Sequence, residues 1–337
     1  MQALMPAAFT RRALLLAASA TASLRLGDAV AQPAESAGLQ ALRERLDAGY
    51  GDVRSIVVLR QGQPLFEYQR NGDPDTLHDV QSVAKSGLSA LVGIALADGR
   101  IASLDQPVVA LMPELSGVNA DPRAAQVTVR HLLTMTSGLD TQAKVDGRDL
   151  AREAIARPFK SAPGEVFAYD NLGYWLLTRV VETAVGQPLP AWAEAKLLQP
   201  LGIARVRWPG EQGNRWMLGM RTRDMATLGQ LFLQDGHWGE RQIVPADYVR
   251  AATQRQNAGG PPVGMDYGYM WWVVPGPGPA TARRTFMASG YGGQLIWVHP
   301  PLDLVVAMTS EASAASQARG QAIQLLRGPL LAAAQGR

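Results

Sequence analysis

The sequence predicts an α+β fold in which strands from both ends of the chain form one antiparallel sheet and a large, mostly helical insert lies between them. The first observation is a hairpin pattern near the N-terminus, where apolar runs at 55–60 and 64–68 flank the turn Gln61-Gly62-Gln63. The second is the return of strand patterns near the C-terminus. These patterns occupy residues 267–274, 295–298 and 304–308, and a further strand is expected to start at 285–288.

Helical patterns account for the rest of the predicted fold. Across 82–256, helical apolar spacing is interrupted by Pro and Gly, which divides the insert into several helices. Terminal helices expected at 37–48 and 315–327 would flank the sheet, and Gly328-Pro329 would end or kink the second. We therefore expect one domain, residues 32–337. Its sheet lobe would comprise residues 37–76 and 261–337, and its helical lobe about residues 77–260.

The composition is that of a globular chain with ample material for a core. Of the 337 residues, 47% are apolar and 18% are charged, and the net charge is only +3. Because Arg is dispersed along the chain, no nucleic-acid surface is expected. Cys is absent, which excludes disulfides, a thiol nucleophile and zinc thiolates. The four His are far apart in the sequence, so we expect neither a metal site nor a cofactor.

The first 31 residues have the features of an export signal. The segment Thr10-Arg11-Arg12-Ala13-Leu14-Leu15 resembles a twin-arginine motif, and the apolar run at 13–24 is short for a membrane span. Ala29-Val30-Ala31 offers small residues for cleavage, so residues 1–31 are interpreted as a signal peptide. The protein is then expected in the periplasm or secreted, without a stable membrane anchor. An uncleaved anchor is the alternative, which the charged residues within the segment disfavour.

Ser82-Val83-Ala84-Lys85 is the only Ser-x-x-Lys in the sequence, and it precedes a run with helical apolar spacing. Residues at i and i+3 share a helix face, so the Lys85 amine would lie beside the Ser82 hydroxyl. A serine hydroxyl needs a base to become a good nucleophile, and a lysine with a lowered pKa can be that base. The helix N-terminus would also aim the Ser82 N–H at an oxyanion. The alternative is a chance pattern with a solvent-facing lysine.

Tyr169-Asp170-Asn171 is the second constellation, and it lies between a Pro-Gly turn and a helical run. It would place a phenol and an amide together at a loop-to-helix junction. Asn171 could instead be a helix N-cap, which is a common position for Asn. Tyr169 could instead be a half-buried aromatic residue.

In this order, the two patterns resemble those of the serine beta-lactamase and penicillin-binding-protein superfamily, and they are most similar to its class C beta-lactamase-related serine hydrolases. Further similar segments extend the resemblance over nearly all of residues 37–330, and they imply a beta-lactamase/transpeptidase-like fold. They lie at 97–101, 104–107, 127–139 and 198–203. Two more, at 267–272 and 289–294, are similar to the 6-aminohexanoate-dimer-hydrolase-like and esterase subset.

The resemblance implies a role for each residue of the two patterns. Ser82 would be the acylating nucleophile and Lys85 its basic partner. Tyr169 would share the proton relay, and Asn171 would form a hydrogen bond with Lys85 or with a substrate amide. Whether Lys85 or Tyr169 is the base stays open, because coupled groups titrate together.

A third motif departs from the family pattern. Ala288-Ser289-Gly290 stands where the beta-lactamases have Lys-Thr-Gly, so the hydroxyl and the glycine are kept and the cation is missing. The backbone N–H of Tyr291 is expected to complete an oxyanion hole with that of Ser82. Arg283 or Arg284 could replace the missing lysine, or they could be solvated charges.

The expected function is an exported serine hydrolase that cleaves ester or amide bonds of a small molecule through a Ser82 acyl-enzyme. One alternative is a beta-lactamase or D,D-peptidase that acts on cell-wall material, which the missing cation at Ala288 disfavours. The other is a non-catalytic penicillin-binding or sensor module. The sequence names neither the natural substrate nor the oligomeric state.

Overall fold

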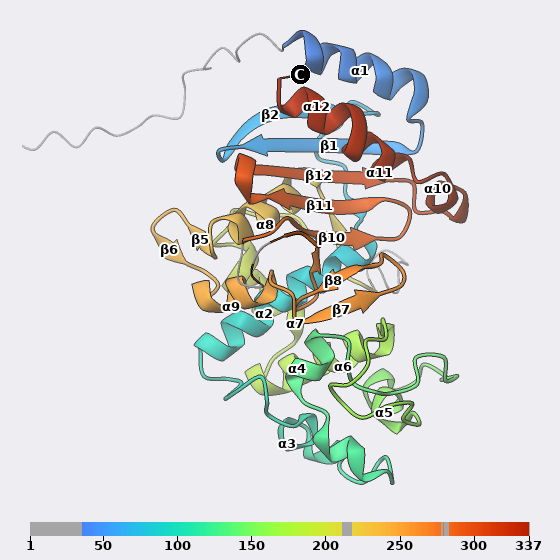
Figure 1. The fold of residues 1–337 in the computed structure, drawn as a ribbon. Coiled ribbons are helices and arrows are strands. Elements are labelled where there is room, and N and C mark those ends of the chain that lie inside the picture. The colour runs from blue at the N-terminus through green and yellow to red at the C-terminus, as the bar shows by residue number, and fades with distance from the viewer. Residues whose placement is uncertain (1–35, 211–217, 278, 280–282, 337) are drawn as a thin grey trace, which may run out of the picture. The chain divides into compact units, whose positions relative to one another are not determined.

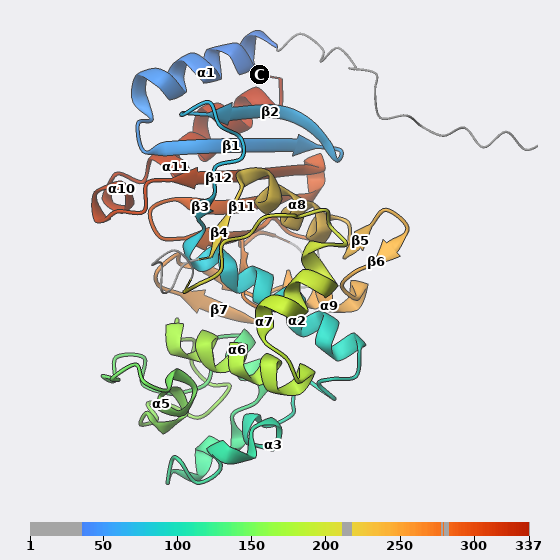
Figure 2. The same ribbon diagram turned by 180° about the vertical axis from the view of Figure 1, so that it is seen from behind.

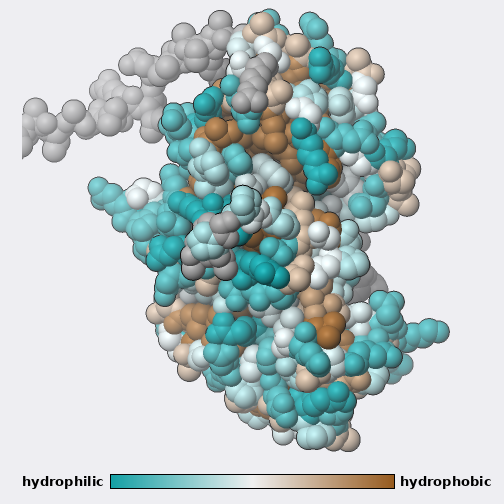
Figure 3. Space-filling view, in the orientation of Figure 1, coloured by the Kyte–Doolittle hydropathy of each residue, from teal (hydrophilic) through white to brown (hydrophobic). Residues whose placement is uncertain are grey.

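The computed structural model describes residues 36–210, 218–277, 279 and 283–336. The signal-peptide prediction for residues 1–31 lies outside the described residues. Among the helices of the described part, none is long and apolar enough to cross a membrane. The face of the molecule in Figure 3 is mostly hydrophilic, with several apolar patches, as is usual for a globular chain.

An eight-stranded antiparallel sheet contains strands from both ends of the chain (Figure 1). The strand order is β2-β1-β12-β11-β10-β9-β8-β7. The bounds are β1 Val53–Arg60, β2 Gln63–Gln69, β7 Asn257–Gly260, β8 Met265–Tyr267, β9 Trp272–Val273, β10 Phe286–Gly290, β11 Gln294–His299 and β12 Leu304–Ser310. Because β1 pairs with β12, the N-terminal hairpin is part of the C-terminal sheet. The predicted α+β fold is confirmed.

The centre of the sheet is buried on both faces. Every residue of β12 is buried, and alternate residues belong to different core clusters. Val306 and Met308 pack with the terminal helices α1 (Ala37–Gly49), α11 (Gln321–Leu325) and α12 (Leu331–Ala334). A further short helix, α10 (Ala314–Arg319), precedes α11. Val305 and Ala307 face the cluster that includes α8 (Thr222–Leu233), which covers the face seen in Figure 2.

The remaining helices form the part of the fold that carries most of the predicted site. They are α2 (Ala84–Ala97), α3 (Val108–Leu111), α4 (Val129–Leu133), α5 (Leu150–Ala156), α6 (Asn171–Val185), α7 (Leu189–Ala193), η4 (Glu194–Leu198) and α9 (Ala246–Ala252). Two small strand pairs interrupt the stretch that we expected to be mostly helical. These are β3 (His78–Asp79) with β4 (Gly219–Met220), and β5 (His237–Trp238) with β6 (Arg241–Gln242). Helix α2 is buried along most of its length.

Two expected elements are divided. The strand predicted at 267–274 is interrupted because the Met270 N–H donates to the Leu133 carbonyl (3.0 Å) and the Met270 carbonyl accepts the Ser86 hydroxyl (2.7 Å). This connection is thereby held against α4 and α2 rather than paired in the sheet. The helix predicted at 315–327 is interrupted at Gly320, which has a φ of 60°. Helical structure resumes at Gln321 and reaches Ala334, but it kinks at Gly328, whose φ of -103° and ψ of -106° are not helical, so the kink predicted at Gly328-Pro329 is confirmed.

Two helical glycines differ in the space around them, which gives a matched stability test. A Cβ at Gly229 of α8 would lie 2.6 Å from Ile296 and 2.7 Å from Val305, whereas a Cβ at Gly87 of α2 would meet nothing within 4 Å. Gly229→Ala should lower the free energy of unfolding by about 1–3 kcal/mol through overpacking. Gly87→Ala should raise it by about 0.5–1 kcal/mol, because Ala favours the helix. Chemical denaturation measures both, and a more stable Gly229→Ala protein would contradict the close packing of α8 on the sheet.

Candidate active site

Ser82 lies at a sharp turn between β3 and α2. The helix is preceded by one 3₁₀ turn, Gln81–Val83, in which Gln81 has a φ of 53°. This left-handed backbone is unfavourable for a non-glycine residue, so surrounding contacts must hold it. The Val80 N–H donates to the Leu218 carbonyl (2.9 Å), and the Val83 N–H donates to the Val80 carbonyl (3.1 Å). The turn therefore presents Ser82, half-buried, at the start of α2.

Lys85 connects Ser82 to Asn171 inside the protein. Its side-chain Nζ donates to Ser82 Oγ (3.0 Å) and to Asn171 Oδ1 (3.0 Å), although the residue is only 5% exposed. Burial lowers the pKa of Lys85 to about 8, and the charge of Asp170 opposes this shift. A neutral amine is therefore accessible near physiological pH. Such an amine could accept the proton of the hydroxyl beside it.

Tyr169 joins the same group through its phenol. Burial raises the pKa of Tyr169, and a hydrogen bond with Ser82 opposes this shift. The Tyr169 ring stacks on Trp272 with 6.0 Å between the ring centroids and 15° between the planes. The Lys85 Nζ lies 5.0 Å from the centroid of the Tyr169 ring and 5.0 Å from that of Tyr174. These aromatic faces favour the charged amine and hold the phenol in place.

Asp170 fixes the residues on either side of it. Its carboxylate accepts the Leu172 N–H (3.0 Å) and pairs with both terminal nitrogens of Arg157 (3.0 and 2.7 Å). Both side chains of this ion pair are almost fully buried. Asp170 is thus the N-cap of α6, and the alternative interpretation of Asn171 as that cap is wrong. Asn171 is instead the first residue of α6, with its amide oxygen on Lys85.

The third motif lies at the end of β10, against the turn that carries Ser82. A Cβ at Gly290 would lie 2.8 Å from the Val80 carbonyl oxygen and 2.9 Å from Gln81 Cβ, so only glycine allows this approach. Ala288 is buried, Ser289 is half-buried, and Tyr291 is 45% exposed. The structure therefore brings the backbone of Gly290 to the Ser82 turn, and the oxyanion role of Tyr291 stays a prediction.

Arg283 and Arg284 are engaged elsewhere. The Arg283 guanidinium hydrogen-bonds to the Leu233 carbonyl and pairs with Asp235, and the Arg284 guanidinium hydrogen-bonds to the carbonyls of a loop before β10. Both residues precede β10, whereas Gly290 ends it. The missing lysine corresponds to Ala288, and at about 3.3 Å per residue roughly 13 Å of extended chain separates Arg284 from it. In this arrangement neither guanidinium occupies the place of the missing lysine.

Several neighbours of the site were not found by sequence reasoning. These neighbours are Trp272, Tyr174 and Arg157. Their contacts join residues far apart in the sequence, and no local pattern carries that information. Within the described ranges, no group of three or more His, Asp or Glu side chains could hold a metal ion.

Comparison with known proteins shows the family to which the chain belongs. The Beta-lactamase family model matches residues 42–327, and the chain belongs to this family of serine hydrolases. The resemblance found in the sequence is thereby confirmed. Solved structures also share the fold, such as a putative beta-lactamase from Bacteroides dorei, with a TM-score of 0.70 and 19% identity over 82% of this chain and 90% of that one.

Two curated relatives are named as hydrolases. The chain is 35% identical over 193 residues to Esterase EstB from Burkholderia gladioli, an alignment that covers 49% of this chain and 48% of EstB. It is 26% identical over 305 residues to the 6-aminohexanoate-dimer hydrolase from Paenarthrobacter ureafaciens, which covers 80% of this chain and 74% of that protein. The match to EstB thus spans about half the length of each protein.

The buried ion pair between Arg157 and Asp170 can be tested for its contribution to the stability of the protein. Asp170→Asn leaves the Arg157 charge buried without a carboxylate, so the free energy of unfolding should fall by about 3–5 kcal/mol. Asp146→Asn, in an exposed pair with Arg148, should change it by less than about 1 kcal/mol. Urea denaturation of both variants makes the comparison. Equal effects would show that the buried pair does not support the start of α6.

Proposed function

We propose that this protein is an exported serine hydrolase that cleaves ester or amide bonds through an acyl-enzyme on Ser82. The observation that carries the proposal is the 3.0 Å contact between Lys85 Nζ and Ser82 Oγ, at an amine whose burial lowers its pKa to about 8. A hydroxyl next to a base of this kind is suited to nucleophilic catalysis. The printed names of the relatives, an esterase and an amide-dimer hydrolase, support the same bond types.

The contacts support a two-step acyl transfer. Ser82 Oγ attacks the substrate carbonyl carbon and its proton passes to neutral Lys85, while the backbone N–H groups of Ser82 and Tyr291 would receive the oxyanion. The intermediate then collapses, the bond to the alcohol or amine breaks, and the leaving group takes a proton from Tyr169 or Lys85. Water, deprotonated by the same groups, attacks the acyl-enzyme and releases the acid. A raised pKa for Tyr169 and a lowered pKa for Lys85 favour Lys85 as the acceptor.

The third motif favours uncharged esters over beta-lactams. A beta-lactam brings a carboxylate to this region, where Ala288 provides no cation and Ser289 only a neutral hydroxyl. A missing charge-assisted hydrogen bond is worth about 1.5–3 kcal/mol, which an uncharged ester does not lose.

We also propose export by the twin-arginine route, because Arg11 and Arg12 form the arginine pair of such a signal. Accumulation of unprocessed precursor in an Arg11→Lys/Arg12→Lys strain would support this route, and unchanged export would refute it.

The role of Ser82 and the preference for esters can be tested together by comparing the wild-type protein with Ser82→Ala. Ser82→Ala should lower kcat/KM for p-nitrophenyl butyrate by about 10³-fold or more, because the nucleophile is lost while the fold is kept. A fluorophosphonate probe should label the wild-type protein and not this variant. Nitrocefin should be a poorer substrate than the ester. Near-wild-type turnover in Ser82→Ala would overturn the mechanism, and a kcat/KM for nitrocefin at or above that for the ester would overturn the specificity.

The pH dependence follows from the state of Lys85. Below its pKa of about 8 the amine is protonated and cannot accept the Ser82 proton, so kcat/KM should fall as the pH drops through about 8 and level off above it. The midpoint belongs to the coupled Lys85–Tyr169 pair. Rates measured from about pH 6 to about pH 9.5 on protein shown to stay folded would reveal this limb. A flat profile would exclude a titrating lysine base, and Lys85→Arg should be inactive throughout.

A further inference from the structure

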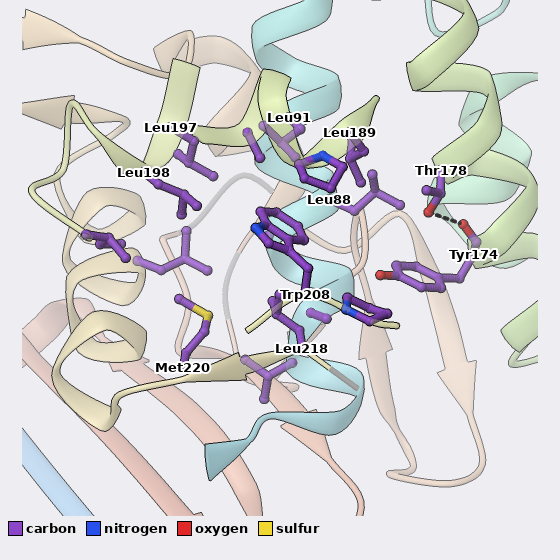
Figure 4. Close-up of a pocket in the computed structure, with 18 of the residues that line it drawn as sticks. Leu88, Leu91, Tyr174, Thr178, Leu189, Leu197, Leu198, Trp208, Leu218 and Met220 are labelled. Atoms are coloured by element: carbon purple, nitrogen blue, oxygen red, sulfur yellow. Dashed lines mark hydrogen bonds between the residues drawn. The ribbon is translucent and has the colours of Figure 1, made fainter. Parts of the chain in front are cut away.

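An apolar cavity of about 230 Å³ lies along α2 next to the Ser82 turn (Figure 4). Its walls come from α2 and the residue before it, from α6, α7 and η4, and from single residues of β4 and α8. The other lining residues are Leu201, Ile203, Trp208, Pro209 and Leu218. In Figure 4 the Trp208 side chain lies in the middle of the group, with leucines of η4 on one side and Leu218 on the other. The cavity therefore lies between α2 and the helices around it, and several of its lining residues are only half-buried.

The lining is suited to a hydrocarbon rather than to a polar group. Most of its side chains are Leu, Ile, Met, Pro or Trp. Polar groups in the wall already have partners, since the Thr178 hydroxyl donates to the Tyr174 carbonyl (3.0 Å) and the Glu182 carboxylate accepts the Leu189 N–H (3.0 Å). Hydrocarbon entering such a space is removed from water at no cost in polar hydrogen bonds.

The cavity and the candidate active site share residues. Val83 and Ala84, which directly follow Ser82, line the cavity. Tyr174 also lines it, and the ring of Tyr174 lies 5.0 Å from Lys85 Nζ. Tyr174 is thus the wall between the lysine and the apolar space.

Gly87 is a second, independent feature of the cavity wall. It lies within α2 and lines the cavity, and a Cβ there would meet nothing within 4 Å. Gly93 in the same helix differs, because a Cβ there would lie 2.6 Å from the Tyr248 ring. Packing therefore accounts for Gly93 but not for Gly87. A glycine inside a helix is destabilising, and here its effect is to leave the cavity open on the α2 side.

We propose that this cavity binds the acyl chain of the substrate and that the preferred substrates are esters of unbranched, medium-length fatty acids. A dry cavity of about 150 Å³ can hold benzene, so about 230 Å³ has room for a chain of about six to eight carbons. The proposal rests on the proposed function. Ser82 Oγ forms the new bond to the acyl carbon, the ester C–O bond breaks, and the alcohol leaves with the proton while the chain stays in the cavity.

The expected substrate profile is asymmetric. With p-nitrophenol as a constant leaving group, kcat/KM should rise from acetate to hexanoate or octanoate and fall for much longer chains. Lengthening the alcohol of an acetate ester should have little effect, because the alcohol lies on the other side of the scissile bond. A rise with alcohol length and none with acyl length would overturn the assignment.

Two variants change the cavity in opposite directions. Gly87→Phe fills it, and the ratio of kcat/KM for octanoate to that for acetate should fall at least about tenfold. Trp208→Ala enlarges it, and the best chain length should increase. Ala97→Phe places the same ring at the exposed end of α2, outside the cavity, and should keep the wild-type profile. Stoichiometric labelling by a fluorophosphonate probe shows that each variant has an intact site.

A binding measurement separates this proposal from the proposed function. In the inactive Ser82→Ala protein, calorimetry should show octanamide binding at least about tenfold more tightly than acetamide, and Gly87→Phe in the same background should remove that preference. An unchanged profile in both cavity variants, with ester turnover through Ser82 intact, overturns the acyl-chain assignment alone. If the wild-type protein neither hydrolyses esters nor reacts with the probe, the proposed function fails and the acyl-chain assignment fails with it.

Discussion

A buried amine is costly unless polar groups and aromatic faces surround it, and this constraint on Lys85 organises the centre of the molecule. The amine requires the Ser82 hydroxyl on its own helix, the Asn171 amide at the start of α6, and the rings of Tyr169 and Tyr174. These partners can meet only if α2 and the beginning of α6 are held together. The same burial that makes the arrangement demanding also lowers the pKa of Lys85 to about 8, so the constraint and the proposed chemistry have one cause.

Two supports keep this arrangement in place. On the helical side, the buried pair between Arg157 and Asp170 anchors the first turn of α6, so Tyr169 and Asn171 project from a fixed backbone. On the sheet side, the end of β10 lies against the turn before α2, with Gly290 close to the Val80 carbonyl. The site therefore lies where the sheet and the helices meet. Strand pairing and a single ion pair determine its geometry together.

The apolar cavity lies beside the site and, in our proposal, determines which acyl chains the site accepts. The proposed catalytic groups lie around Lys85, whereas the cavity follows the face of α2 that carries Gly87, Leu88 and Leu91. In these two proposals, one helix contributes to catalysis and to substrate binding through different faces. Tyr174 lies between them, with its ring near the Lys85 amine and also in the cavity wall.

The sequence by itself determined the elements whose information is local. Spacing at i and i+3 placed Lys85 beside Ser82, the hairpin pattern gave β1 and β2 nearly to the residue, and the Tyr-x-Asn pattern marked the start of α6. Only the tertiary structure decided that Asp170 rather than Asn171 caps that helix, that Met270 divides a predicted strand, and that Trp272 stacks on Tyr169. It also decided the cavity beside Gly87. These features depend on contacts between residues distant in the chain, which periodicity and spacing do not encode, because the free energy of such contacts exists only once the helices and the sheet have packed.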